Sequence, residues 1–175
     1  MTEQSSNCNP QAAVAFVALG SNMGDSENLL RQAMERLARF STARLRKSSL
    51  WQTTPVNCPP GSPPFLNAVV GLVARPGETP ETLLAELHRL EREFGRTPKM
   101  VLNEPRRLDL DLIAFNHETR NTPSLTLPHP RAHQRRFVLQ PLSEIAPDLI
   151  LPGQPLTISE LLAALRSDEK LARLD

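Results

Sequence analysis

The sequence predicts an α+β fold with a mainly antiparallel sheet and a C-terminal helical extension. Apolar runs of strand length and helical periods follow one another in the order strand, helix, strand, strand, helix, strand. This βαββαβ order is typical of a ferredoxin-like α/β sandwich, in which two helices cover one face of the sheet. The 175 residues suffice for one domain and its core. We therefore expect a flexible tail over residues 1–11 and a single domain over residues 12–175.

The first strand and helix lie near the N-terminus. Residues 12–19 (AAVAFVAL) form an apolar run of strand length that ends at the turn GSNMG (residues 20–24). Residues 28–40 then place apolar side chains at spacings of three and four, which indicates an amphipathic helix that Asp25 and Ser26 can cap. The turn lacks both the lysine ending of a Walker loop and a three-glycine fingerprint, so it predicts only a sharp turn.

The next elements surround a proline-rich loop. Residues 45–53 alternate loosely and predict a strand, whereas residues 55–64 contain five prolines and one glycine and predict a stiff loop. Residues 65–74 (FLNAVVGLVA) predict another strand. Residues 80–94 repeat the helical period, and Gly95 is a typical C-cap. After residue 127 come turns and two shorter helical patterns, over residues 138–146 and 159–165, which form the expected extension.

The strand expected over residues 108–115 (LDLDLIAF) carries the clearest functional signal. Its alternation places Asp109 and Asp111 on one face, with Cβ atoms roughly 7 Å apart. Such carboxylates can hold one or two divalent ions, and Mg²⁺ in nucleotide sites commonly takes one or two carboxylates together with phosphate and water oxygens. Alone, so short a pattern is more often a solvent-facing polar stripe.

Basic residues on both sides of the acid pair favour the functional interpretation. Arginine forks together with a metal ion make a clamp for a triphosphate. Some of the arginines, particularly Arg107, Arg131 and Arg136, are equally explained by ordinary surface ion pairs. The basic residues before the pair are Arg96, Lys99, Arg106 and Arg107, and those after it are His129, Arg131, His133, Arg135 and Arg136.

Asn67 is the polar exception within an otherwise apolar strand. A buried amide needs hydrogen-bond partners, which here are either the edge of a bound heterocycle or the proline-rich loop. Both interpretations stay open at this point. Phe65 and Phe137 are, on local pattern alone, more typical of core residues than of ligand-stacking ones.

Three blocks of the sequence resemble the 6-hydroxymethyl-7,8-dihydropterin pyrophosphokinase family: VALGSNMGD (17–25), PRRLDLDLIAF (105–115) and LPHPRAHQRRFVLQPLSEIAPDL (127–149). The segments SSLWQTTPV and FLNAVV give weaker support. The resemblance implies a ferredoxin-like sandwich and a step of folate biosynthesis. In that step the pterin hydroxymethyl oxygen attacks the β-phosphorus of ATP and AMP is released, with two Mg²⁺ ions bridging the ATP phosphates and the hydroxyl.

The resemblance also implies roles for individual residues. Asp109 and Asp111 match the metal-binding pair and, with Arg96 and Arg106, form the expected catalytic set. The expected ATP-binding residues are Glu91, Arg96, Lys99, Arg106, Thr126, His129 and Arg135. The expected pterin-binding residues are Thr53, Thr54, Val56, Phe65, Asn67 and Phe137, with the two aromatic rings stacking on the heterocycle.

Residues 97–105 (TPKMVLNEP) depart from the family pattern, which often has more basic residues and a tryptophan here. Lys99 can supply the missing charge, whereas Glu104 would compete for Arg106. Asn103 and Glu104 therefore leave a second interpretation open, in which the protein is an inactive relative that binds nucleotide without transferring phosphate.

Composition excludes several other classes. Twenty basic and 19 acidic residues give a net charge of +1, so the global charge indicates neither nucleic acid nor a membrane as partner. Only 4% of residues are aromatic and no RNP-like run occurs, which argues against an RNA-binding sandwich. Cys8 and Cys58 lack a C-x-x-C arrangement and read as free thiols. With no secretory pattern in residues 1–11, we expect a cytoplasmic protein, and a monomer.

Overall fold

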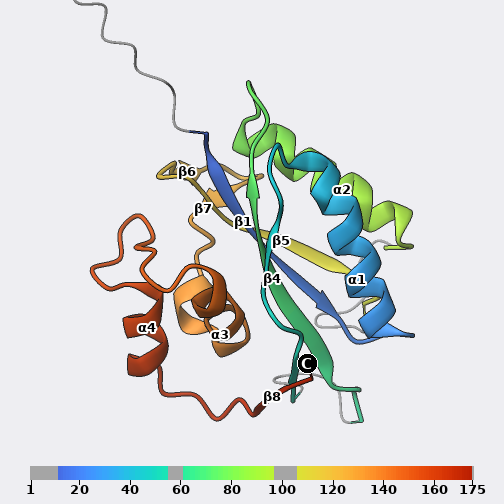
Figure 1. The fold of residues 1–175 in the computed structure, drawn as a ribbon. Coiled ribbons are helices and arrows are strands. Elements are labelled where there is room, and N and C mark those ends of the chain that lie inside the picture. Colours follow the sequence, from blue (N-terminus) through green and yellow to red (C-terminus); the bar gives the residue numbers. More distant parts are fainter. Residues whose placement is uncertain (1–11, 55–60, 97–105, 175) are drawn as a thin grey trace, which may run out of the picture.

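The computed structural model describes residues 12–54, 61–96 and 106–174, and it shows an antiparallel sheet with helices on both faces (Figure 1). The main sheet contains β1 (Val14–Ser21), β2 (Arg46–Lys47), β3 (Trp51–Thr53), β4 (Phe65–Val73), β5 (Asp109–Phe115) and β8 (Leu171–Arg173). A separate hairpin pairs β6 (Arg120–Asn121) with β7 (Thr126–Leu127). The helices are α1 (Ser26–Leu37), α2 (Pro80–Glu93), α3 (Arg136–Ile145) and α4 (Ile158–Ala164), with short 3₁₀ segments at Ala38–Phe40 and Ala132–Gln134.

The strand order confirms the predicted α+β sandwich. Along the sheet the strands run β5-β1-β4-β3-β8, and β2 also pairs with β4. Two β-α-β units therefore interleave. In the unit β1-α1-β3, strand β4 lies between β1 and β3, and in the unit β4-α2-β5, strand β1 lies between β4 and β5. All the pairings between these strands are antiparallel.

The strand predicted over residues 45–53 is two short strands, because its pairing with β4 shifts by one residue. Lys47 lies opposite Val70, but Trp51 lies opposite Asn67, so three residues face two between these pairs. The Ser48 hydroxyl accepts a hydrogen bond from the Val69 amide (2.9 Å) and so replaces a backbone acceptor at the irregularity. The alternation of the sequence does not reveal this break.

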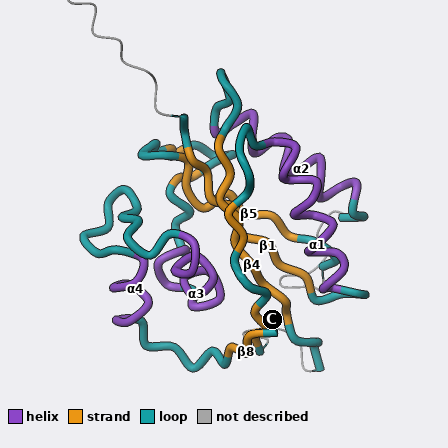
Figure 2. The backbone as a smooth tube through the Cα atoms, viewed as in Figure 1, coloured by secondary structure: helices purple, strands orange, loops and turns teal. Residues whose placement is uncertain are grey.

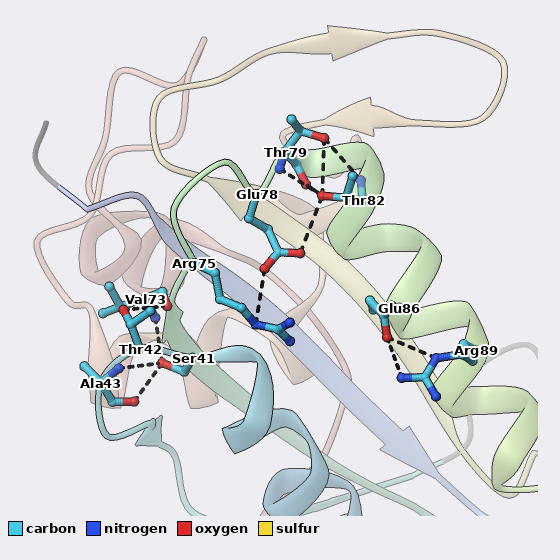
Figure 3. A network of polar contacts seen from close by, with 10 residues as sticks. All are labelled: Ser41, Thr42, Ala43, Val73, Arg75, Glu78, Thr79, Thr82, Glu86 and Arg89. Carbon is cyan, nitrogen blue, oxygen red and sulfur yellow. Dashed lines mark hydrogen bonds and ion pairs between the residues drawn. The ribbon is translucent and has the colours of Figure 1, made fainter.

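Side-chain caps fix where the two sheet-covering helices begin. The Asp25 carboxylate accepts a hydrogen bond from the Asn28 amide (3.2 Å) at the start of α1, as predicted. At the start of α2, Thr79 and Thr82 form a reciprocal capping box, shown in Figure 3 with the neighbouring Arg75 to Glu78 ion pair. The capping box fixes the residue at which α2 begins.

Helices α1 and α2 pack on one face of the sheet, as expected (Figures 1 and 2). Leu30 and Leu37 of α1, with Leu83 and Leu87 of α2, are fully buried in one apolar cluster. The cluster includes alternate strand residues, among them Val17, Leu19, Val70, Leu72, Leu110 and Leu112. The alternation expected for residues 108–115 is therefore confirmed, since Leu108, Leu110 and Leu112 share this face.

Helices α3 and α4 cover part of the opposite face. Their Val138, Leu142 and Ile158 form a second apolar cluster with Phe16, Val69 and Ile113 of the sheet. The cluster stops there: on the same face, the next residues of β1, β4 and β5 include Gly20, Asn67 and Asp109. The helical extension thus leaves one end of this face to polar residues. No helix in the described ranges is long and apolar enough to cross a membrane.

Candidate active site

A row of paired residues crosses the sheet at this polar end. Gly20 of β1 lies opposite Asn67 of β4 on one side and opposite Asp109 of β5 on the other. Trp51 of β3 continues the row beyond Asn67. Directly opposed residues project to the same face, and adjacent strands are roughly 5 Å apart. The Asn67 amide and the Asp109 carboxylate therefore flank a glycine, which contributes no side chain between them.

The two acidic side chains lie on one face of β5, as the alternation predicted. Asp111 lies opposite Ala18 and Asp109 opposite Gly20, two positions apart on β1. Burial raises the pKa of Asp111 above its ordinary value, and the neighbouring Asp109 raises it further. Two acids held this close without a bound cation disfavour the doubly charged state, so the pair is suited to receive positive charge.

Two arginines that precede β5 in the sequence contact Asp109. Arg106 Nη1 lies 2.5 Å from Asp109 Oδ2, and Arg96 Nη1 lies 3.3 Å from Asp109 Oδ1. Both arginines belong to the predicted catalytic set. The structure brings them together although ten positions separate them in the sequence.

Asn22 fixes the backbone of Arg106, a contact that the sequence did not suggest. The Asn22 amide donates to the Arg106 carbonyl (3.1 Å), and the Arg106 amide donates to Asn22 Oδ1 (2.8 Å). Asn22 is only 4% exposed. The turn over residues 20–24 is therefore more than a sharp connection, because it holds an arginine of the site in place. Since 84 residues separate the partners, no local pattern could have shown the pair.

Glu91 is buried beneath the arginines. Only 1% of it is exposed, its Oε1 accepts a hydrogen bond from the Leu110 amide (2.8 Å), and it forms an ion pair with Arg96. Burial raises the pKa of Glu91 to about 7, against the opposing effects of the Leu110 amide and Arg96. Glu91 thus links α2 to β5 and holds Arg96 beside Asp109.

His129 and Arg135 lie near Asp111, because the charge of each acts to lower the pKa of that carboxyl group. The His129 amide donates to the Ile113 carbonyl (2.8 Å), and its Nδ1 accepts from the Arg131 amide (3.2 Å). Burial lowers the pKa of His129, with Asp111 acting in the opposite direction. Burial, followed by the nearby Arg131, lowers the pKa of the Arg135 guanidinium. A neutral His129 with Nδ1 occupied carries its proton on Nε2.

A cavity of about 300 Å³ lies beside the acids, between α2, β5 and the β6-β7 hairpin. It brings together Arg96, Asp111, Thr126 and His129 of the predicted residues. Its other lining residues are Leu84, His88, Leu110, Leu112, Thr122, Pro123, Ser124, Leu125 and Pro130. A volume of this size, with apolar walls and a few converging polar groups, is typical of small-ligand sites.

The sequence missed His88, Thr122 and Ser124 as lining residues. His88 precedes Glu91 by three positions and so shares its helix face, which was the available signal. Burial and the positive charges of Arg96 and Arg92 lower the pKa of His88. The Thr122 hydroxyl accepts a hydrogen bond from the Leu125 amide (3.1 Å) in the short turn of the hairpin. The two-residue strands of the hairpin carry too little periodicity to be predicted.

Three of the residues expected to bind a pterin, Thr53, Phe65 and Asn67, lie on β3 and β4, on the other side of Gly20 from the acids. Asn67 Nδ2 donates to Thr53 Oγ1 (2.9 Å), and both side chains are buried. Phe65 lies opposite Thr53 on the neighbouring strand. Phe137 lies on α3, which packs against β3 and β4, and the Arg135 guanidinium carbon is 5.4 Å from its ring centroid. The alternative partner of Asn67 was the proline-rich loop over residues 55–64, of which residues 55–60, including Val56, lie outside the described part of the chain. Lys99, Asn103 and Glu104 also lie outside it.

The fold and this arrangement define an α+β domain with a charged candidate ligand site at the edge strand β5 and a buried amide, Asn67, beside it. The chain belongs to the 7,8-dihydro-6-hydroxymethylpterin-pyrophosphokinase family, whose model matches residues 16–147. The expected resemblance is thereby confirmed.

Relatives and solved structures agree with this membership. A 2-amino-4-hydroxy-6-hydroxymethyldihydropteridine pyrophosphokinase of Bacillus subtilis is 41% identical over 133 residues, which cover 75% of this chain and 77% of the relative. The protein of the same name from Haemophilus influenzae is 36% identical over 162 residues, covering 92% and 98%. A Plasmodium falciparum HPPK-DHPS structure has a similar fold, with a TM-score of 0.69 at 13% identity. The match covers 87% of this chain but 44% of that longer one.

Proposed function

We propose that this chain transfers diphosphate from ATP to the hydroxymethyl oxygen of 6-hydroxymethyl-7,8-dihydropterin, releasing AMP, as a step of folate biosynthesis. Family membership supports the reaction. The observation that carries it to this site is the acid pair of β5, with Arg96 and Arg106 in contact with Asp109 and with His129 and Arg135 near Asp111.

The cavity beside α2 is proposed to take ATP. Its apolar residues suit the base and its polar residues the sugar, while Arg96 and His129 line the end at Asp111. Arg106, held by Asn22, lies next to that end through its contact with Asp109. Charge-assisted hydrogen bonds from these groups would orient the phosphates along the edge of β5.

The donor set fits Mg²⁺ bound together with a nucleotide. Among the described residues, no group of three or more histidine, cysteine or acidic side chains converges on one point. Asp109 and Asp111 alone would therefore leave most of an octahedral shell to phosphate and water oxygens, as is usual for Mg²⁺. We propose two such ions with ATP. When bound, they would supply charge neutralisation and a lowered pKa for the attacking hydroxyl.

The residues of the chain then contribute mainly by positioning. Diphosphate transfer requires the attacking oxygen, the β-phosphorus and the leaving oxygen to be aligned, and it requires stabilisation of the charge that develops on the phosphate oxygens. Arg96 and Arg106 supply positive charge beside Asp109. We assign no histidine as an essential general base.

The pterin is proposed to lie between the Asn67 row and α3. Asn67 would read the polar edge of the heterocycle, and the Thr53 hydroxyl holds its amide in orientation. Phe65 and Phe137 would contact the faces of the ring, and Thr54 and Val56 would belong to the adjoining loop. The open space over Gly20 would then connect the pterin to the acid pair.

The alternative is an inactive relative that binds ATP without transfer. Incubation with Mg²⁺-ATP and 6-hydroxymethyl-7,8-dihydropterin, with chromatography of the nucleotides, separates the two. We expect pterin-dependent AMP. Pterin-dependent ADP would mean that a single phosphate is moved, and ATP binding without turnover would favour the inactive relative. Binding of neither ligand would refute both. A cytoplasmic monomer remains our prediction, which fractionation and light scattering would test.

A further inference from the structure

Helix α3 begins without a cap of its own. The residue at its N-cap position is Arg135, which makes no side-chain capping hydrogen bond, and the first turn contains no acidic residue. The first amides of a helix lack partners within the helix, and positive charge is unfavourable at that end. Because Arg135 and Arg136 stand there, the start of α3 requires an anionic group from elsewhere in the chain.

Glu169 supplies that group from the C-terminal segment. Its Oε2 accepts a hydrogen bond from the Phe137 amide (3.2 Å), 32 residues earlier in the sequence. Its charge also favours the protonated form of Arg135, which burial disfavours. Glu169 therefore acts on both residues that the site draws from the start of α3.

The residues next to Glu169 are fixed to the opposite wall of the proposed pterin site. The Lys170 carbonyl accepts a hydrogen bond from the Thr54 amide (3.2 Å), and Leu171 lies opposite Thr53 in the pairing of β8 with β3. In Figure 1 the chain runs from α4 to β8, which forms the outermost strand beside β3. Three consecutive residues thus connect the start of α3 with the end of β3.

We infer that Glu169 is a positioning residue that sets the distance between Phe137 and the Thr53 to Asn67 pair. The inference rests on the proposed function, because that proposal assigns these three side chains to the pterin. The cavity proposed for ATP is lined by α2, Arg96, β5 and the residues from Thr122 to Pro130, and none of the contacts described for Glu169 reaches them. The one described link between Glu169 and the residues proposed for ATP is its charge, which acts on Arg135, and a guanidinium keeps its own charge without it. Loss of the Glu169 contact should therefore affect the pterin far more than ATP.

The test compares Glu169→Ala and Glu169→Gln with Asp168→Ala. Asp168 is the exposed neighbour of Glu169, so its replacement removes the same charge without the contact to α3. Glutamine keeps an oxygen acceptor for the Phe137 amide. The measurements are KM for each substrate, binding of 6-hydroxymethylpterin with a non-hydrolysable ATP analogue, binding of that analogue alone, and the Tm.

For Glu169→Ala we expect the pterin KM and Kd to rise about tenfold, which is about 1.4 kcal/mol. The affinity for the ATP analogue should stay within about twofold, and the Tm should fall only slightly, since one partly exposed hydrogen bond is lost. Glu169→Gln should recover most of the pterin affinity. Asp168→Ala should match the wild type.

Four results would overturn the inference. Equal losses in Asp168→Ala and Glu169→Ala would indicate a general charge effect. Parallel loss of both ligands with a large fall in Tm, in the glutamine variant as well, would indicate a purely structural role. Unchanged pterin affinity in Glu169→Ala, with an active wild type, would refute this inference alone. A wild type that neither binds pterin nor forms AMP would refute the proposed function and the inference with it.

Discussion

Gly20 lies opposite Asn67, and a Cβ atom placed on Gly20 would be 3.3 Å from Asn67 Oδ1. That distance is closer than ordinary van der Waals contact, so any side chain there would press on the amide. Gly20 is not among the glycines with positive φ. The backbone at this position does not require a glycine. Its presence is explained by the space that it leaves between Asn67 and Asp109.

Gly20→Ala should weaken pterin binding. The added methyl group fills part of the gap between the amide and the acids, so we expect the pterin KM to rise at least about tenfold and the fold to lose about 1–3 kcal/mol of stability. A double-mutant cycle with Asn67→Ala checks the mechanism by steady-state kinetics. In the Asn67→Ala background the methyl group no longer meets an amide, and its added effect should shrink. Fully additive losses would show that the methyl group acts elsewhere.

Asn67→Ala should lower pterin affinity with little effect on ATP. The change removes the group proposed to read the heterocycle and leaves the cavity beside α2 untouched. Calorimetric titration with each ligand measures the two affinities separately. Thr53→Val serves as the matched variant, since it keeps Asn67 but removes the acceptor of its Nδ2. An intermediate loss is expected there, whereas equal loss of both ligands in Asn67→Ala would contradict the assignment.

Asp111→Ala and Asp111→Asn should abolish turnover without weakening the fold. Because burial and Asp109 raise the pKa of Asp111, its negative charge opposes folding at neutral pH. Its removal should therefore raise the Tm while AMP formation falls by about 10³-fold or more, the scale seen when a charge-stabilising group is lost. Asp148→Asn, at an exposed acid, is the control and should change neither quantity. A fall in Tm parallel to the fall in activity would mean that Asp111 is structural.

Local patterns predicted the elements that local physics determines. The alternation of residues 108–115 divided them correctly between the two faces of the strand, because a strand has only two. The Asp25 cap and the period of α2 were likewise visible, since each depends on residues within one turn. The acid pair was found for the same reason.

Partners far apart in the sequence were not predictable in this way. Nothing near Asn22 indicates Arg106, and nothing near Phe137 indicates Glu169. Strand β8 and the β6-β7 hairpin are too short for a period, and they exist because a paired neighbour supplies their hydrogen bonds. The covering of the second face by α3 and α4 depends on tertiary packing, which the sequence order alone leaves undetermined.

Glu91→Gln should change how stability depends on pH. The pKa of Glu91 is raised from 4.5 to about 7 in the folded protein, mainly by burial. Its contribution to stability is therefore fully present below about pH 4.5 and is lost as the pH rises through about 7. At about 1.4 kcal/mol for each unit of pKa, the loss across this window is about 3 kcal/mol.

Glutamine cannot ionise, so the variant should not lose this stability. Its free energy of unfolding should therefore increase relative to that of the wild type as the pH rises from 4.5 to 8. Urea unfolding at several pH values measures the difference, and Glu86→Gln, at an acid paired with Arg89 on the surface of α2, provides the control. A constant difference across the window would show that Glu91 stays ionised throughout, held by Arg96. The variant should also release Arg96 from its ion pair and so weaken ATP binding at neutral pH. Greater stability with weaker binding would identify Glu91 as a residue kept at a cost to folding in order to position Arg96.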